Sequence, residues 1–175
     1  MSRLAVPAVL SAMLLLTGCG DSAQMKFAPA CPQLALLADG AELTRFAGAG
    51  RDVTDRLLEA RITGVEAACR NGRNGAVIAT IKLQTAIARG PAARTRTVQV
   101  PYFVAVMDGD AVLDRRQFTI DASFPANVDA MNAPGGELEL RFPGAGAGGA
   151  APFKIVVSLQ LTEEELAHNR RTTRR

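Results

Sequence analysis

Apolar and polar residues alternate along most of the chain after residue 31, and a period of two is typical of strands with one buried face. Over residues 76–88 the apolar side chains share one face, while Thr80, Lys82 and Gln84 share the other. The same alternation continues in further segments, which we expect to be strands. They span residues 34–37, 42–46, 55–70, 97–107, 118–124, 137–142 and 153–161.

The alternation is interrupted at residues that favour turns and irregular backbone. Gly64 stands where the phase slips within residues 55–70, and a glycine at a phase slip indicates a β-bulge. Pro101 has no N–H to give to a ladder, so it predicts an edge or bulged position for its strand. Turns are expected at Asn71-Gly72, Asn74-Gly75 and Asp108-Gly109-Asp110.

The periodicity changes after residue 162. Thr162 and Glu165 have the Thr-x-x-Glu spacing of a capping box, in which two side chains satisfy backbone donors of the first helical turn. Carboxylates at the start and arginines at the end of the segment suit the helix dipole. We expect a short exposed helix and a frayed basic tail over residues 163–175.

Seven or so short strands with frequent turn signals predict an all-β protein, an antiparallel β-sandwich with an immunoglobulin-like or fibronectin-like arrangement. A small closed barrel is the main alternative. The chain contains no Trp, so the tryptophan of antibody domains is missing. Its length suits one such domain, which we place at residues 31–162.

A different pattern opens the chain. Arg3 makes the start basic, and the apolar run from Leu4 to Leu16 is shorter than the roughly 20 residues of a spanning helix. The run ends in Leu16-Thr17-Gly18-Cys19. This motif resembles the lipobox of bacterial lipoproteins, which implies cleavage after residue 18 and two or three acyl chains on Cys19. The alternative is an ordinary signal peptide.

The lipobox resemblance also implies a location in the cell. Residues 1–18 are then a signal peptide, and residues 19–30, which are small and polar, form a flexible tether that keeps the folded domain near the lipid. In the Gram-negative sorting pattern, an Asp directly after the cysteine retains a lipoprotein in the inner membrane, but here Gly20 follows. We therefore expect an anchor in the outer membrane, facing the periplasm, with membrane lipid as one partner.

Two cysteines, Cys31 and Cys69, remain once Cys19 is assigned to lipid. Because the periplasm is oxidising, we expect them to form a disulfide, and two buried free thiols are the alternative. Two cysteines and one distant histidine are too few ligands for a metal site, and we expect no cofactor. Exported location and a folded part of nearly balanced charge argue against nucleic-acid binding.

Few residues suit catalysis. His168, the one histidine, lies on the predicted terminal helix, where it suits the helix dipole. The pairs Asp52 with Asp55 and Asp108 with Asp110 lie in turns, where Asp is expected for backbone reasons. With Asp114, the second pair forms only a fragment of a calcium loop. We therefore expect no catalytic residue.

Two features are candidates for contact with a partner. Tyr102 and Phe103 point to opposite faces of one strand, so we expect one in the core. The other is a candidate contact residue, although packing on the sheet face is favoured for it. A basic cluster at the C-terminus is favoured as a solvated tail, and the alternative is a contact site for lipid headgroups, cell-wall carboxylates or an acidic partner. It consists of Arg170, Arg171, Arg174 and Arg175.

The mature chain resembles a group of uncharacterised alphaproteobacterial lipoproteins. The resemblance lies in the Cys31-Pro32 opening, Pro101-Tyr102-Phe103 and the segment from Leu161 to Arg171, and it implies no activity. The sequence favours a non-enzymatic structural or protein-interaction module that binds an envelope protein. The alternative is a lipoprotein that binds a small molecule or glycan, which a sizeable cavity lined by polar groups would favour.

Overall fold

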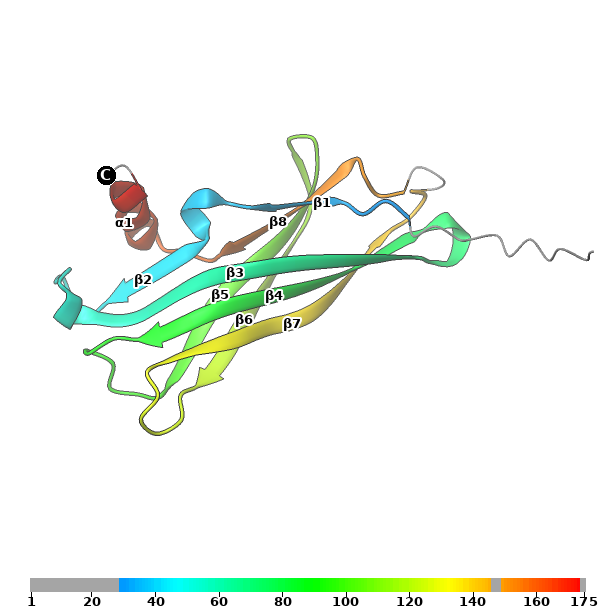
Figure 1. The fold of residues 1–175 in the computed structure, drawn as a ribbon. Coiled ribbons are helices and arrows are strands. Elements are labelled where there is room, and N and C mark those ends of the chain that lie inside the picture. Colours follow the sequence, from blue (N-terminus) through cyan, green and yellow to red (C-terminus); the bar gives the residue numbers. More distant parts are fainter. Residues whose placement is uncertain (1–28, 146–148, 174–175) are drawn as a thin grey trace, which may run out of the picture.

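The computed structural model describes residues 29–145 and 149–173, which form two four-stranded sheets and a C-terminal helix (Figure 1). The strands are β1 (Gln33–Leu36), β2 (Glu42–Phe46), β3 (Arg56–Asn71), β4 (Val77–Arg89), β5 (Thr97–Asp108), β6 (Ala111–Ser123), β7 (Ala130–Phe142) and β8 (Phe153–Leu159). The helix is α1 (Glu163–Thr173). The segments expected to be a signal peptide and a tether lie outside the described residues, apart from residues 29 and 30, and so do Cys19, Arg174 and Arg175.

The two sheets form a β-sandwich, which confirms the expected fold class. Sheet A has the order β1-β8-β5-β6, and sheet B has the order β2-β3-β4-β7. All neighbours are antiparallel except β1 and β8, which run parallel. Three consecutive strands, β2 to β4, are neighbours in sheet B. This order differs from the ABED and CFG sheets of immunoglobulin constant domains.

The core lies between the inner faces of the sheets, where the alternating apolar residues meet. Ala79 of β4, Val100 of β5 and Ile155 and Val157 of β8 are fully buried. Buried and accessible residues alternate along β4, as the pattern over residues 76–88 predicts. The period-two segments therefore identified the buried faces correctly, because each strand has one face against the opposite sheet.

The bulge predicted in β3 is present. The ladder between β3 and β4 shifts register between Ile62 and Gly64, and Val65 and Cys69 beyond the shift pack against the core. Strand β7 is longer than residues 137–142 because pairing with β4 continues through Pro134 to Ala130. A proline is tolerated there because β7 is the last strand of its sheet.

The expectation that Pro101 marks an edge strand is wrong, and the ladder with β6 is regular at Pro101 because the irregularity of β5 lies at Val106 and Met107. Strand β5 lies inside sheet A, between β8 and β6. Pairing between β5 and β8 begins at Tyr102 and Leu159, so Pro101 lies one residue beyond the ladder. The Pro101 carbonyl accepts a hydrogen bond of 2.8 Å from the Gln160 backbone N–H. The missing N–H costs no ladder bond because β8 has already ended.

Cys31 and Cys69 form a disulfide, with a Cα–Cα distance of 5.6 Å. The bond joins the start of the sandwich domain to β3, the second strand of sheet B. This confirms the pairing that was expected from an even number of cysteines in an oxidising compartment.

The C-terminal helix is docked on the sandwich, and the prediction of an exposed helix is wrong. Thr162 and Glu165 form the predicted capping box, with backbone-to-side-chain bonds of 2.9 and 3.2 Å. The Asn169 side-chain amide donates to the backbone carbonyls of Asp39 and Glu42, and Arg170 Nε lies 3.0 Å from Asp39 Oδ2. Polar side chains make these contacts, so no apolar stripe along the helix reveals them in the sequence.

Candidate binding site at the open end of the sandwich

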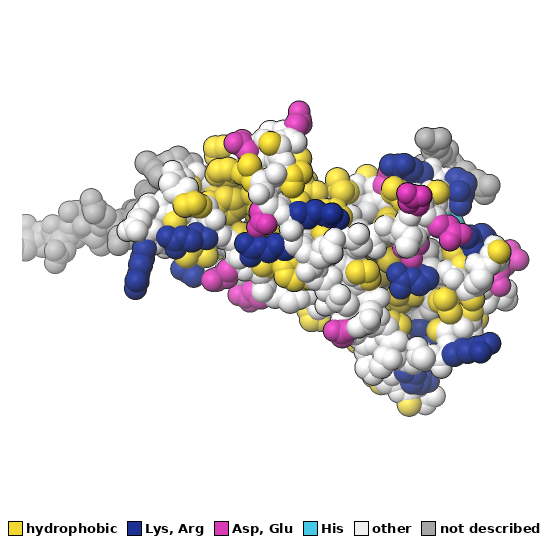
Figure 2. Space-filling view, turned by 180° about the vertical axis from the view of Figure 1, so that it is seen from behind, with side chains coloured by type: hydrophobic (Ala, Val, Ile, Leu, Met, Phe, Trp, Pro, Cys, Tyr) yellow, Lys and Arg dark blue, Asp and Glu magenta, His cyan; other side chains and the backbone are white. Residues whose placement is uncertain are grey.

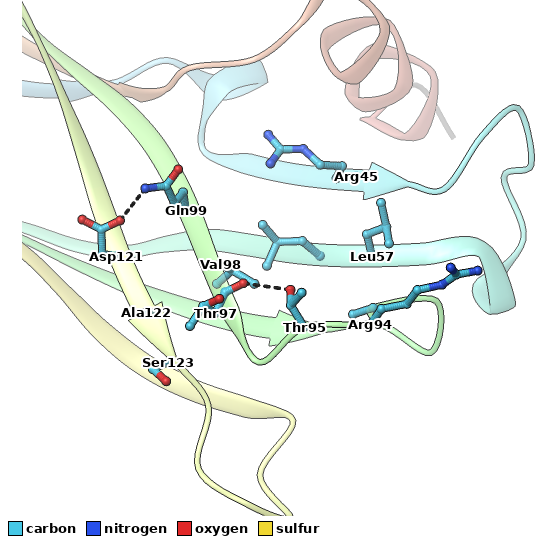
Figure 3. Close-up of a pocket in the computed structure, with 12 residues that line it drawn as sticks. Arg45, Leu57, Arg94, Thr95, Thr97, Val98, Gln99, Asp121, Ala122 and Ser123 are labelled. Carbon is cyan, nitrogen blue, oxygen red and sulfur yellow. Dashed lines mark hydrogen bonds between the residues drawn. The ribbon is translucent and has the colours of Figure 1, made fainter.

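A hollow lies where the two sheets separate, and we call it the mouth (Figure 3). It has a volume of about 630 Å³. Strands β2 and β3 line one side, β5 and β6 line the other, and the β4–β5 loop closes one end. The described chain begins toward the opposite end of the sandwich from the mouth (Figure 1).

The interior of the mouth is apolar because it continues the core. Leu58 and Ala122 are buried members of the core cluster, while Leu57 and Val98 are partly buried and pack against it. A ligand that covered Leu57 and Val98 would remove further apolar surface from water, which is worth about 25 cal/mol for each Å² buried.

The rim of the mouth is polar. Gln99 Nε2 donates a hydrogen bond of 2.8 Å to Asp121 Oδ1, and the Thr95 hydroxyl donates one of 3.1 Å to the Thr97 carbonyl (Figure 3). Both interactions leave acceptor positions accessible at the surface, because each oxygen has more than one lone pair. Ligand-binding sites usually have an apolar interior and a few polar groups of this kind.

Two arginines lie at the mouth. Arg45 of β2 is half-buried and its Nε lies 2.9 Å from Glu165 Oε1 of the helix, so its charge is compensated. Arg94 is exposed on the β4–β5 loop, and no acidic side chain in the described part of the chain forms an ion pair with it. Arg94 is therefore the cation at the mouth that is available to an anionic group.

The β4–β5 loop that carries Arg94 is held in place by its neighbours. The backbone N–H groups of Gly90 and Ala92 donate to the carbonyls of Leu57 and Arg56, at 2.9 and 3.0 Å. Arg89 Nη2 donates a hydrogen bond of 2.8 Å to the Ala93 carbonyl. These bonds tie the loop to the first residues of β3, so the position of Arg94 is set before any ligand arrives.

The aspartates considered from the sequence have local roles. Asp52 and Asp55 form a capping box in the turn before β3, where the Asp52 N–H donates to Asp55 Oδ2 at 3.1 Å. Asp108 and Asp110 flank Gly109 of the β5–β6 turn, which has a φ of +56°. Asp114 forms an ion pair of 2.9 Å with Arg116. Within residues 29–145 and 149–173, no three His, Cys, Asp or Glu side chains gather as metal ligands would.

His168 lies on α1 but faces the sandwich. Its ring meets that of Phe46 edge-on, with centroids 5.2 Å apart. The guanidinium of Arg51 lies over the same phenylalanine ring at 5.3 Å and forms an ion pair with Glu164. His168 therefore helps to pack α1 against β2, which the sequence did not indicate.

Tyr102 and Phe103 do lie on opposite faces of sheet A. Tyr102 is buried and stacks on Phe118 with centroids 5.3 Å apart, and its burial raises the pKa of its hydroxyl. Phe103 lies on the outer face, where the guanidinium of Arg115 is 4.3 Å from its ring centroid. Phe103 is thus partly covered by a cation–π contact within the chain.

The arginines of the predicted basic cluster lie in different environments. Arg170 is paired with Asp39 at the helix–sandwich contact, whereas Arg171 is exposed. Arg174 and Arg175 lie outside the described residues. On the face shown in Figure 2, basic and acidic side chains are interspersed, and hydrophobic ones gather around the base of the β5–β6 hairpin.

The mouth was not predicted from the sequence. Its residues come from four strands and a loop, and their only local signal is the Gly90-Pro91 break that precedes Arg94.

Comparison with protein families, curated proteins and solved structures finds no match for this chain. Among residues 29–145 and 149–173, the structure contains no helix with the length and apolarity needed to cross a bilayer.

Proposed function

We propose that this chain is a lipid-anchored protein of the bacterial envelope that acts by binding another envelope protein at the mouth. The observation that carries the proposal is the shape and chemistry of the mouth, an apolar interior of about 630 Å³ with the uncompensated cation Arg94 at its entrance. The anchor is the lipidated Cys19 expected from the lipobox. The end of the domain that holds the mouth then points away from the membrane, because the described chain starts at the other end.

The partner we envisage presents an extended segment with an acidic residue beside an apolar one. The acidic group pairs with Arg94, and the apolar side chain covers Leu57 and Val98 inside the mouth. A backbone amide of such a segment finds an acceptor at the rim, where the Thr95 hydroxyl oxygen is accessible. A preformed site of this kind loses little conformational entropy on binding.

Binding is favoured over catalysis by the states of the reactive side chains. Cys31 and Cys69 are joined to each other, so neither is a thiolate nucleophile. His168 packs against Phe46. The carboxylate of the rim, Asp121, is engaged by Gln99.

A second candidate function is the binding of a glycan or small molecule in the same mouth. The specific observation in its favour is the Gln99–Asp121 pair, because neighbouring amide and carboxylate groups suit the hydroxyls of a sugar. The protein partner is favoured because the residues inside the mouth are aliphatic and small, and none of its lining residues is aromatic.

A photo-crosslinking amino acid placed at Thr95 tests the proposal in intact envelopes. We expect an adduct of protein size that depends on the charge of Arg94 and is lost in Arg94→Glu. Two matched controls are available: the same crosslinker at Thr63, exposed on β3, and Arg73→Glu, at the far end of the sandwich. An adduct of small mass at Thr95 would favour the second function. No adduct there, or equal adducts at both positions, would contradict both.

A further inference from the structure

Strand β6 has an unusually open edge. It pairs with β5 alone and is the last strand of sheet A. The other terminal strands are interrupted or short: β1 has four residues, β2 has five and is covered by α1, and β7 contains Pro134 and a register shift. The β5–β6 ladder is regular from Asp114 to Ser123, because its irregularity lies beyond Asp114, toward the hairpin. Proteins usually block such an edge, since its backbone groups can pair with another strand.

The backbone phase of β6 identifies which residues face that edge. The Phe124 N–H donates a hydrogen bond of 2.8 Å to the Arg96 carbonyl, so the even-numbered residues of β6 are those that bond to β5. Backbone groups alternate in direction along an antiparallel strand, so the odd-numbered residues present their N–H and C=O groups at the open edge. Their side chains lie on the outer face of sheet A, and they are Arg115, Gln117, Thr119 and Asp121.

We propose that two copies of this chain pair through β6 as antiparallel neighbours, with a two-fold axis at Phe118. Only a register that opposes odd residues to odd residues allows the edge groups of both copies to bond. With the axis at Phe118, Gln117 opposes Thr119, and Arg115 opposes Asp121 of the second copy. By symmetry this charge pair occurs twice. An axis at Arg115 or Arg116 would instead oppose arginine to arginine, which is unfavourable.

The present contacts of the two charged residues leave room for this pairing. Arg115 lies over Phe103 and donates to Gln160 Oε1 at 3.1 Å, so several of its five N–H donors are still available. Asp121 receives its bond from Gln99 at Oδ1, and Oδ2 is available. The other two charged residues of β6, Asp114 and Arg116, already form an ion pair of 2.9 Å within one copy.

The pairing also changes the mouth. Asp121 lies on its rim, so Arg115 of the second copy would add a cation beside the Gln99–Asp121 pair. The two mouths of the dimer would lie on the same face of a continuous eight-stranded sheet, because the two-fold axis is perpendicular to that sheet. The inference does not depend on which ligand the mouth binds, and its failure would leave the proposed function intact.

Charge exchange tests the register directly. In sedimentation of the full-length protein in detergent micelles, we expect a dimer that Arg115→Asp or Asp121→Arg weakens about tenfold or more, because each change opposes like charges at two symmetric positions. The double variant Arg115→Asp/Asp121→Arg should restore affinity to within about threefold of the wild type. Glu66→Lys, a matched reversal on the outer face of sheet B, should leave the dimer unchanged.

A second measurement does not depend on the charges. In the proposed register, residues 117 and 119 of opposite copies have Cα atoms about 5.5 Å apart, a separation that a disulfide spans. Gln117→Cys/Thr119→Cys should therefore give a dimer that is covalent under oxidising conditions. A wild-type chain that stays monomeric up to about 0.1 mM would overturn the inference. So would a dimer that responds to neither single reversal, or a double variant that fails to recover.

Discussion

Glu165 is bound at both of its carboxylate oxygens by residues of two different elements. Arg45 Nε of β2 lies 2.9 Å from Oε1, and the Thr162 backbone N–H donates to Oε2 at 2.9 Å. One side chain therefore caps the first turn of α1 and holds the helix against sheet B. Glu165 is 7% exposed, so the interaction is shielded from solvent, although Arg45 reaches the surface.

Removing this carboxylate should destabilise the protein. We expect Glu165→Ala to lower the free energy of unfolding by about 2–3 kcal/mol, because it removes a helix cap and leaves a half-buried guanidinium without its partner. Urea unfolding measures the change. Glu163→Gln, at an exposed position of the same helical turn, is the matched control and should cost less than about 0.5 kcal/mol. Equal losses in both variants would show that the contact contributes nothing.

Lipidation at Cys19 is expected to hold the protein on the membrane. Cys19→Ser should abolish acylation and move the protein from the membrane fraction to the soluble fraction, because acyl chains supply the anchor. Fractionation with a high-salt and carbonate wash is the measurement, and metabolic labelling with a fatty acid reports acylation separately. A variant that stays membrane-bound after the wash would refute the lipobox assignment.

The disulfide should contribute substantially to stability. Cys31→Ser/Cys69→Ser should lower the free energy of unfolding by about 3.5–4 kcal/mol, as the chain-entropy model gives for a bridge across 38 residues. Comparison of denaturant unfolding for the two proteins gives the difference. The single variant Cys31→Ser should lose a similar amount and gain an alkylatable thiol at Cys69. An unchanged midpoint in the double variant would contradict the prediction.

Gly90 should be essential for the shape of the mouth. A Cβ at Gly90 would overlap the carbonyl of Arg56, so Gly90→Ala must displace the β4–β5 loop that carries Arg94. We expect a loss of about 1–3 kcal/mol in unfolding free energy and a weaker Thr95 crosslink in envelopes. Gly136→Ala is the control, because a Cβ at Gly136 meets no neighbouring atom within 4 Å. If Gly90→Ala leaves both stability and crosslink unchanged, the loop is not held as described.

The strands and turns were predictable because their signals are local. Alternation over residues 76–88 and the phase slip at Gly64 record which side of the chain meets the opposite sheet. The docking of α1 was not predictable, because Asn169 and Arg170 bind residues about 130 positions earlier and their polarity resembles that of a solvated helix. The placement of Pro101 inside the sheet was missed for a related reason, since it depends on where β8 ends.

The mouth was even less predictable from the sequence, because it is formed only by contacts between distant residues. Arg94 looks like any exposed loop arginine until the fold brings Leu57 of β3 and Val98 of β5 beside it. The cysteine pair could be predicted without such knowledge, because counting the cysteines left after Cys19 yields a single pairing. A site that is assembled from distant residues of common types cannot be found by a count of this kind.

The disulfide also determines how the domain bears mechanical load. Under the proposed anchor at Cys19, the chain would be pulled through its N-terminal segment whenever the membrane and a bound partner move apart. The pull enters the sandwich at Cys31, and the covalent bond to Cys69 passes it to β3, which is paired along its length with β4. The four-residue strand β1 follows Cys31 in the chain and is therefore spared from being peeled off β8. Reduction of the bond would move the same tension onto β1, making it the first element to detach.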